Sequence, residues 1–209
     1  MKRFSNILVA LGVTLFLMSV GMKSEAEAQC KSGYTYKKVT MTIGGCPWEI
    51  EICYKCGLTY PGEVYLIGAT PIKNPPCVAV TLQEALDYAY GQLGNYDYII
   101  NILCTNTPYL VPPCPTQSQK LILNYNYCWK MKKIMYHGVE TIRFLPCGTG
   151  YCTEEITFCF DVLTQSIIKT TYSFMTEPPY CSLEENEVEI PDNVGDESNC
   201  FLYHSPCNP

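Results

Sequence analysis

The chain carries the segment CPWEIEICY at positions 46–54 and a related segment, CTEEITFCF, at positions 152–160. Both fit the pattern C-x-x-E-I-x-[IF]-C-[YF] with identical spacing. In the first copy the side chains alternate, with Ile50 and Ile52 on one face of an extended strand and Glu51 on the other. The alternation predicts a β-strand with one face against a core in each copy.

The similarity continues beyond these strands. Each copy is followed by a β-prone run, a proline pair with a cysteine, and a helix-start signature. In the first copy these are 63–72, Pro75-Pro76-Cys77 and Thr81-x-x-Glu84, and in the second 166–174, Pro178-Pro179-Tyr180-Cys181 and Ser182-x-x-Glu185. Two copies are too few for a solenoid. We therefore expect a mainly β fold, with α+β as the alternative, in which antiparallel strands form two related disulfide-stapled β modules.

One α-helix is expected at about 82–93. Thr81 is its N-cap, Gly94 follows its end, and apolar residues recur at helical spacing: Leu82, Ala85, Leu86, Ala89 and Leu93. Further strands are predicted at 34–43, 98–104, 121–131 and 139–145, with turns at Pro61-Gly62 and His137-Gly138.

The first 28 residues have the pattern of a signal peptide. Lys2 and Arg3 precede an apolar stretch at 7–22, and an A-x-A cleavage site ends at Ala28. We expect modules at 29–115 and 116–209. No other stretch reaches the roughly 20 apolar residues of a membrane span, so the mature chain is expected to be secreted, extracellular or bound at the cell surface.

All 14 cysteines follow the predicted cleavage site. An even number in an exported chain favours seven structural disulfides. A domain of this length buries a sizeable core without crosslinks, so we expect the bridges to serve durability outside the cell at least as much as folding. The cysteines are Cys30, Cys46, Cys53, Cys56, Cys77, Cys104, Cys114, Cys128, Cys147, Cys152, Cys159, Cys181, Cys200 and Cys207.

Strand geometry restricts the pairing of these cysteines. Seven extended residues span roughly 23 Å, whereas a disulfide joins Cα atoms about 4.4–6.8 Å apart. Cys46 is therefore expected not to pair with Cys53, nor Cys152 with Cys159. A bridge from Cys104 to Cys114 would close the irregular loop between them.

Residues for catalysis are scarce. The chain has two histidines, His137 in a predicted turn and His204 near the C-terminus, and it lacks the nucleophile-elbow, P-loop, dinucleotide and H-E-x-x-H motifs. Glu49 and Glu51 fit a solvated strand face better than a pair of catalytic carboxylates. We predict no enzymatic activity, no cofactor and no metal, and leave open a calcium site in the acidic segment 184–197.

The overall charge argues against nucleic-acid binding. The chain has a formal net charge of −6, and only 16% of its residues are charged. The basic cluster Lys130, Lys132 and Lys133 is interpreted as a solvated strand face, because phosphate binding requires a broad basic surface. Seventeen tyrosines on a weakly charged chain are compatible with contact surfaces and equally with the lining of a sheet.

The leading hypothesis is a non-enzymatic structural or adhesive subunit, outside the cell or on its surface, whose partner is itself or another cell-envelope or extracellular protein. A second is a glycan- or small-ligand-binding module with an aromatic surface, which would comprise Trp48, Tyr125, Tyr127 and Trp129. A third is an extracytoplasmic thiol–disulfide protein using the C-x-x-C motif of Cys53 and Cys56.

Overall fold

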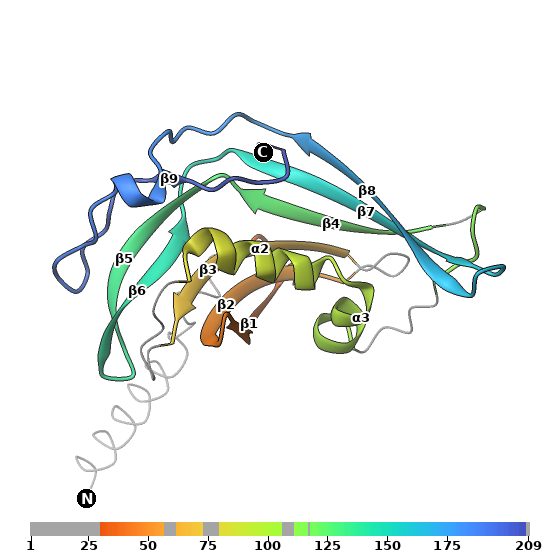
Figure 1. The fold of residues 1–209 in the computed structure, drawn as a ribbon, viewed down its shortest axis with the longest axis horizontal. Coiled ribbons are helices and arrows are strands. Elements are labelled where there is room, and N and C mark those ends of the chain that lie inside the picture. The colour runs from red at the N-terminus through yellow and green to blue at the C-terminus, as the bar shows by residue number, and fades with distance from the viewer. Residues whose placement is uncertain (1–29, 57–61, 73–79, 106–110, 117, 208–209) are drawn as a thin grey trace, which may run out of the picture.

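The computed structural model describes residues 30–56, 62–72, 80–105, 111–116 and 118–207. The predicted signal peptide, Pro61 of a predicted turn, and Cys77 lie outside the described residues. Within them the chain is mainly β, as predicted, and its strands join in one curved sheet (Figure 1). The strands are β1 (Thr35–Ile43), β2 (Cys46–Lys55), β3 (Gly62–Pro71), β4 (Gln119–Asn126), β5 (Cys128–Tyr136), β6 (Val139–Pro146), β7 (Tyr151–Asp161), β8 (Ser166–Met175) and β9 (Phe201–Leu202).

The duplicated segment forms the central strand of two similar three-stranded units. In the first, β2 pairs antiparallel with β1 and β3. In the second, β7 pairs antiparallel with β4 and β8. The units meet where residues 62–65 of β3 pair in parallel with residues 121–124 of β4. One sheet therefore runs through both predicted modules, and the division of the chain into 29–115 and 116–209 remains a prediction.

The predicted strand at 121–131 is divided between β4 and β5, with a break at Tyr127. β5 continues into β6 through a turn in which His137 and Gly138 have φ values of 49° and 80°, as in a type I′ hairpin turn. In the described ladder, only the pair Ala69–Phe144 joins β6 to β3. The β5–β6 hairpin nevertheless lies beside β2 and β3, since Arg143 and Tyr136 donate to Glu51 and Glu49 of β2 (Figure 1).

The predicted helix is α2 (Leu82–Leu93), which lies in the hollow of the curved sheet (Figure 1). Thr81 and Glu84 form the expected capping box. The apolar residues of its periodic face are at most 1% exposed. Tyr90 stacks on Tyr125 of β4 with ring centroids 3.9 Å apart, and its hydroxyl donates to the Asn124 carbonyl.

The strand predicted at 98–104 is helical instead. The chain forms α3 (Tyr96–Tyr98) and a short π-helix, η2 (Ile99–Leu103). The Asn95 side chain caps this segment by accepting from the Asp97 N–H at 2.9 Å. Ile99 and Leu103 are buried four residues apart. Burial at this spacing favours a helix, and it outweighs the preference of the adjacent residues Ile99 and Ile100 for a β-strand.

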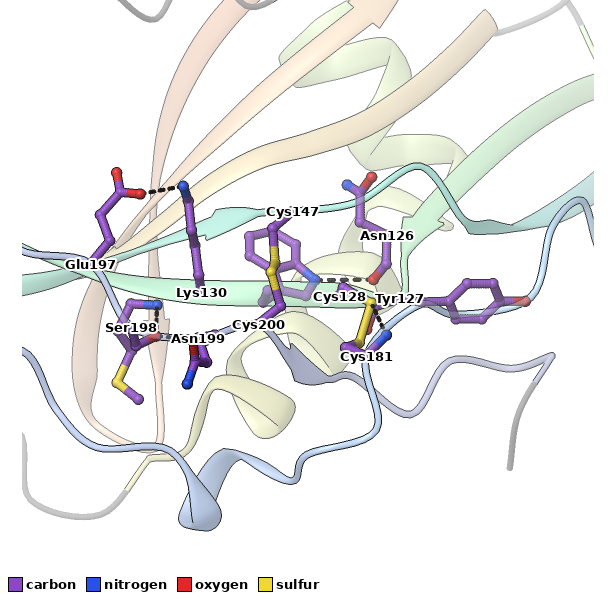
Figure 2. The surroundings of a disulfide bond; sticks show 12 residues. Asn126, Tyr127, Cys128, Lys130, Cys147, Cys181, Glu197, Ser198, Asn199 and Cys200 are labelled. Atoms are coloured by element: carbon purple, nitrogen blue, oxygen red, sulfur yellow. Dashed lines mark hydrogen bonds and ion pairs between the residues drawn. A yellow bond between two sulfur atoms is a disulfide. The ribbon is translucent and has the colours of Figure 1, made fainter.

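The helix-start signature of the second copy yields only η3, a 3-10 turn at Glu185–Glu187. Glu184, and not Ser182, is its N-cap. The Glu185 carboxylate instead accepts from Leu82 N–H at the start of α2. Two crosslinks hold this segment, Cys128–Cys181 to the start of β5 and Cys147–Cys200 to the residue after β6 (Figure 2), so it has little freedom to form a helix.

The structure places six disulfides among the described cysteines. They are Cys30–Cys53, Cys56–Cys104, Cys114–Cys159, Cys128–Cys181, Cys147–Cys200 and Cys152–Cys207. Cys46 is also disulfide-bonded. The exclusion of pairing within each repeated strand is confirmed for Cys53, Cys152 and Cys159. The bridge that could have closed the loop between Cys104 and Cys114 does not form, because Cys104 is bonded to Cys56 and Cys114 to Cys159.

Candidate functional site

The four aromatic residues predicted to form a binding surface belong to the core. Trp48 is 2% exposed, Tyr125 4%, and Tyr127 and Trp129 are both fully buried. The Trp129 indole N–H donates to the Asn126 carbonyl at 3.0 Å, so its polar group is satisfied internally. This corrects the expectation of an exposed aromatic surface, and these residues do not provide a stacking platform for a glycan.

The C-x-x-C motif does not form a redox pair. Cys53 is fully buried and bonded to Cys30, while Cys56 is bonded to Cys104. A thiol oxidoreductase cycles between a dithiol and a disulfide within its motif. Since the two sulfurs belong to separate bridges here, the motif consists of two structural half-cystines.

Glu51 is not on a solvated face, contrary to the prediction. It is 1% exposed, and its carboxylate accepts from Arg143 at 2.8 Å and from the Tyr36 hydroxyl at 2.9 Å. Burial, followed by the charge of Glu51, raises the pKa of Tyr36. Gly68 lies opposite, and a Cβ there would come within 2.9 Å of the carboxylate. The arrangement is a packed ion pair in which the carboxylate is bonded to a guanidinium and a hydroxyl.

Glu49 belongs to the same polar network but lies nearer its edge. Its carboxylate pairs with Lys38 at 2.7 Å and accepts from the Tyr136 hydroxyl at 2.8 Å. Burial and this hydrogen bond raise the pKa of Tyr136 to about 12. Both carboxylates are therefore engaged by cations and hydroxyls.

The basic cluster is neutralised by acidic partners. Lys130 and Lys132 both pair with Glu197, and Lys133 pairs with Glu140 at 3.0 Å. The two lysines lower the pKa of Glu197. Across the described residues, no group of three or more histidine, cysteine, aspartate or glutamate side chains is placed to hold a metal ion.

A cavity of about 680 Å³ opens between the start of α2, β5 and the C-terminal segment. Its buried wall is apolar, with Leu82, Met131 and Phe201 each at most 5% exposed. Glu185 lies at its margin, and burial raises the pKa of this carboxyl. The volume falls within the range of small-ligand pockets, and the lining would suit an apolar molecule.

The most unusual surface of the molecule is β8, which ends the sheet in the described chain. It pairs with β7 on one side only. Nine of its ten residues are exposed, among them Ile167, Ile168, Tyr172, Phe174 and Met175. Its only charged residue is Lys169, and it contains no proline and no register shift. Natural sheets usually protect such an edge with charge, proline or a bulge.

The backbone of β8 presents hydrogen-bonding groups outward at every second residue. Thr176 donates to the carbonyl of Tyr151 at 3.1 Å, and these two residues are in register with the β7–β8 ladder. Even-numbered residues of β8 therefore bond to β7 in the antiparallel pattern, and odd-numbered residues point their N–H and C=O groups away from the sheet. These outward residues are Ile167, Lys169, Thr171, Ser173 and Met175.

Disulfides fix the strand that supports this edge. Both ends of β7 are crosslinked, by Cys152–Cys207 and Cys159–Cys114, and Cys181 anchors the chain shortly after β8. The β7–β8 turn is fastened by Asp161, which accepts from Leu163 N–H at 2.9 Å and from the Thr164 hydroxyl at 2.7 Å. The open edge is thus presented on a braced hairpin.

Sequence reasoning predicted this strand but not its position at the edge. The signal available was the sequence of β8 itself, SIIKTTYSFM, in which apolar residues occur in adjacent pairs and do not alternate. A strand with one face in the core alternates. The lack of alternation therefore argues against a strand with one face in the core, and the structure shows that β8 is exposed on both faces.

Comparison with known proteins gives no relative. No family model, no curated protein and no solved structure matches the chain. In the part of the chain that the structure describes, no helix is long and apolar enough to cross a membrane.

Proposed function

We propose that this chain is an exported, non-enzymatic structural subunit that assembles outside the cell or at its surface by adding strands to β8. The observation that carries the proposal is the ten-residue open edge, with exposed apolar side chains and a single charge. Exposed hydrophobic surface of this kind marks interaction sites in folded proteins, and strand addition is an established mode of recognition.

The disulfides support this role. An uncovered apolar strand is a hazard when a protein unfolds, because loose strands aggregate in many registers. Crosslinks at both ends of β7 restrict local opening around the edge. A subunit built this way keeps the β8 edge available in a defined form in an oxidising environment, where disulfides persist.

The proposal is tested by the size of the purified, oxidised protein over a range of concentrations. We expect the wild-type chain to associate, and the double variant Ile168→Lys/Tyr172→Lys to associate roughly tenfold more weakly, because it places charge on the apolar face of the edge. Leu163→Lys is the matched control, since Leu163 is 94% exposed in the turn before β8 and outside the ladder.

Sedimentation velocity measures the result, and circular dichroism verifies that each variant is folded. A wild-type chain that stays monomeric at the highest concentration would contradict the proposal. Equal association of the double variant and the Leu163→Lys control would show that assembly uses another surface.

A further inference from the structure

We infer that β8 pairs antiparallel with β8 of a second copy of this chain, in a register centred on Thr171. The two sheets would then continue into one another across a twofold axis. This inference rests on the proposed function and names the partner and the geometry of the same edge.

Symmetry limits the registers available to two identical strands. A twofold axis perpendicular to the sheet reverses the strand direction and preserves the faces, so one residue must lie opposite itself. With Thr171 on the axis, Lys169 faces Ser173 and Ile167 faces Met175. All five outward residues on each strand are then paired, and each pair exchanges two hydrogen bonds.

The two neighbouring registers on the side of the β7–β8 turn are poorer. With Thr170 on the axis, Met175 would face Gln165, which lies in the turn with a φ of 51° and cannot continue a regular ladder. With Lys169 on the axis, two ammonium groups would face each other, and like charges directly opposite destabilise a sheet.

The side chains are complementary in the Thr171 register. On the face carrying the even-numbered residues, Ile168 lies opposite Phe174 of the second copy, and Thr170 lies opposite Tyr172. Aromatic and β-branched cross-strand pairs stabilise sheets. Tyr172 and Phe174 already contact each other within one strand, with ring centroids 5.8 Å apart, so the two copies would form one continuous aromatic band.

The other long outer strand of the described sheet, β1, suits β8 less well. β1 and β8 run in the same direction in the sheet. If β8 of one copy were added to β1 of the next, with the same face of both sheets on one side, the two strands would therefore run parallel. A parallel pair is slightly less stable per residue than an antiparallel pair. β1 also carries Lys37 and Lys38, which would repel Lys169. The parallel junction inside the molecule spans only four residues.

A charge-swap experiment tests the register. Thr171 is exposed, so the variants Thr171→Lys and Thr171→Glu should fold. On the axis, residue 171 faces itself, and we expect Thr171→Lys to weaken the homodimer roughly fivefold. Mixing it with Thr171→Glu should give a heterodimer tighter than either homodimer. Native mass spectrometry with one variant labelled with ¹⁵N measures the three populations.

Ser166 supplies the matched control, because it is an exposed hydroxyl residue on the same strand whose two copies lie far apart in this register. Ser166→Lys mixed with Ser166→Glu should show no preference for the heterodimer. A Thr171→Glu homodimer tighter than the mixture would indicate that residue 171 faces a lysine and would overturn the inference. If the wild-type chain associates and the Thr171 mixture shows no preference, the register is wrong and the proposed function stands. A monomeric wild-type chain contradicts both.

Discussion

Tyrosines perform two different tasks in this chain. Tyr90, Tyr125 and Tyr203 are at most 4% exposed and connect α2 to the sheet through stacked rings. The Tyr203 hydroxyl donates to Asp87 at 2.9 Å. Tyr172, by contrast, is 67% exposed on β8. Composition alone left contact surfaces and sheet lining equally open; the structure shows tyrosines that line the sheet and an exposed tyrosine on the strand proposed for contact.

The buried ion pair of Glu51 and Arg143 gives a prediction at this scale. Arg143→Met leaves a carboxylate that is 1% exposed with only a tyrosine partner. Breaking a buried pair by removing one member costs about 3 kcal/mol or more. We expect that loss in the free energy of unfolding, measured by denaturant titration of the oxidised protein.

Lys38→Met is the comparison, since it removes a cation from the more exposed pair with Glu49. Such pairs contribute about 1 kcal/mol or less. Similar small losses in the free energy of unfolding of both variants would contradict this prediction, because they would show that the buried Glu51 carboxylate does not need Arg143 as its partner.

At the scale of elements, local signals predicted structure well where one face meets the core. Helix α2 has the predicted bounds because its cap and its apolar spacing agree with its packing. The signals failed where long-range contacts decide. The second capping signature forms only a 3-10 turn, because crosslinks and a contact with α2 fix that segment. The edge position of β8 depends on the order of the strands in the sheet, which cannot be predicted from the strand propensity of the segment.

Glu185 links the C-terminal segment to α2 and makes stability depend on pH. Burial raises the pKa of this carboxyl above that of an unfolded chain, so folding favours its protonated form. Its contribution is most favourable below the ordinary glutamate pKa of about 4.3 and is lost as pH rises through the folded value. Glu185→Gln removes this titration and keeps a carbonyl acceptor for the helix N-terminus.

We therefore expect the stability of Glu185→Gln, relative to the wild-type chain, to increase as pH rises from about 4 towards neutrality. Unfolding midpoints measured across this range provide the test. A pH-independent difference between the two proteins would contradict the account of Glu185.

At the scale of the whole molecule, the two repeated three-stranded units explain how the sheet is built and why β8 is unpaired on its outer side. In the first unit, the outer side of β3 is occupied by β4 and β6. The equivalent side of β8 in the second unit has no partner strand among the described residues. The crosslinks brace the hairpin that carries this edge. The molecule thus presents β8 as an unpaired strand edge on a crosslinked hairpin.

Amide hydrogen exchange at β8 tests this claim most directly. In the dilute monomer, the N–H groups of even-numbered residues bond to β7 and should be protected, while those of Ile167, Lys169, Thr171, Ser173 and Met175 should exchange freely. On concentration into the associated state, the account predicts that these five amides become protected. Association that leaves the five amides unprotected, or no association at all, would contradict it.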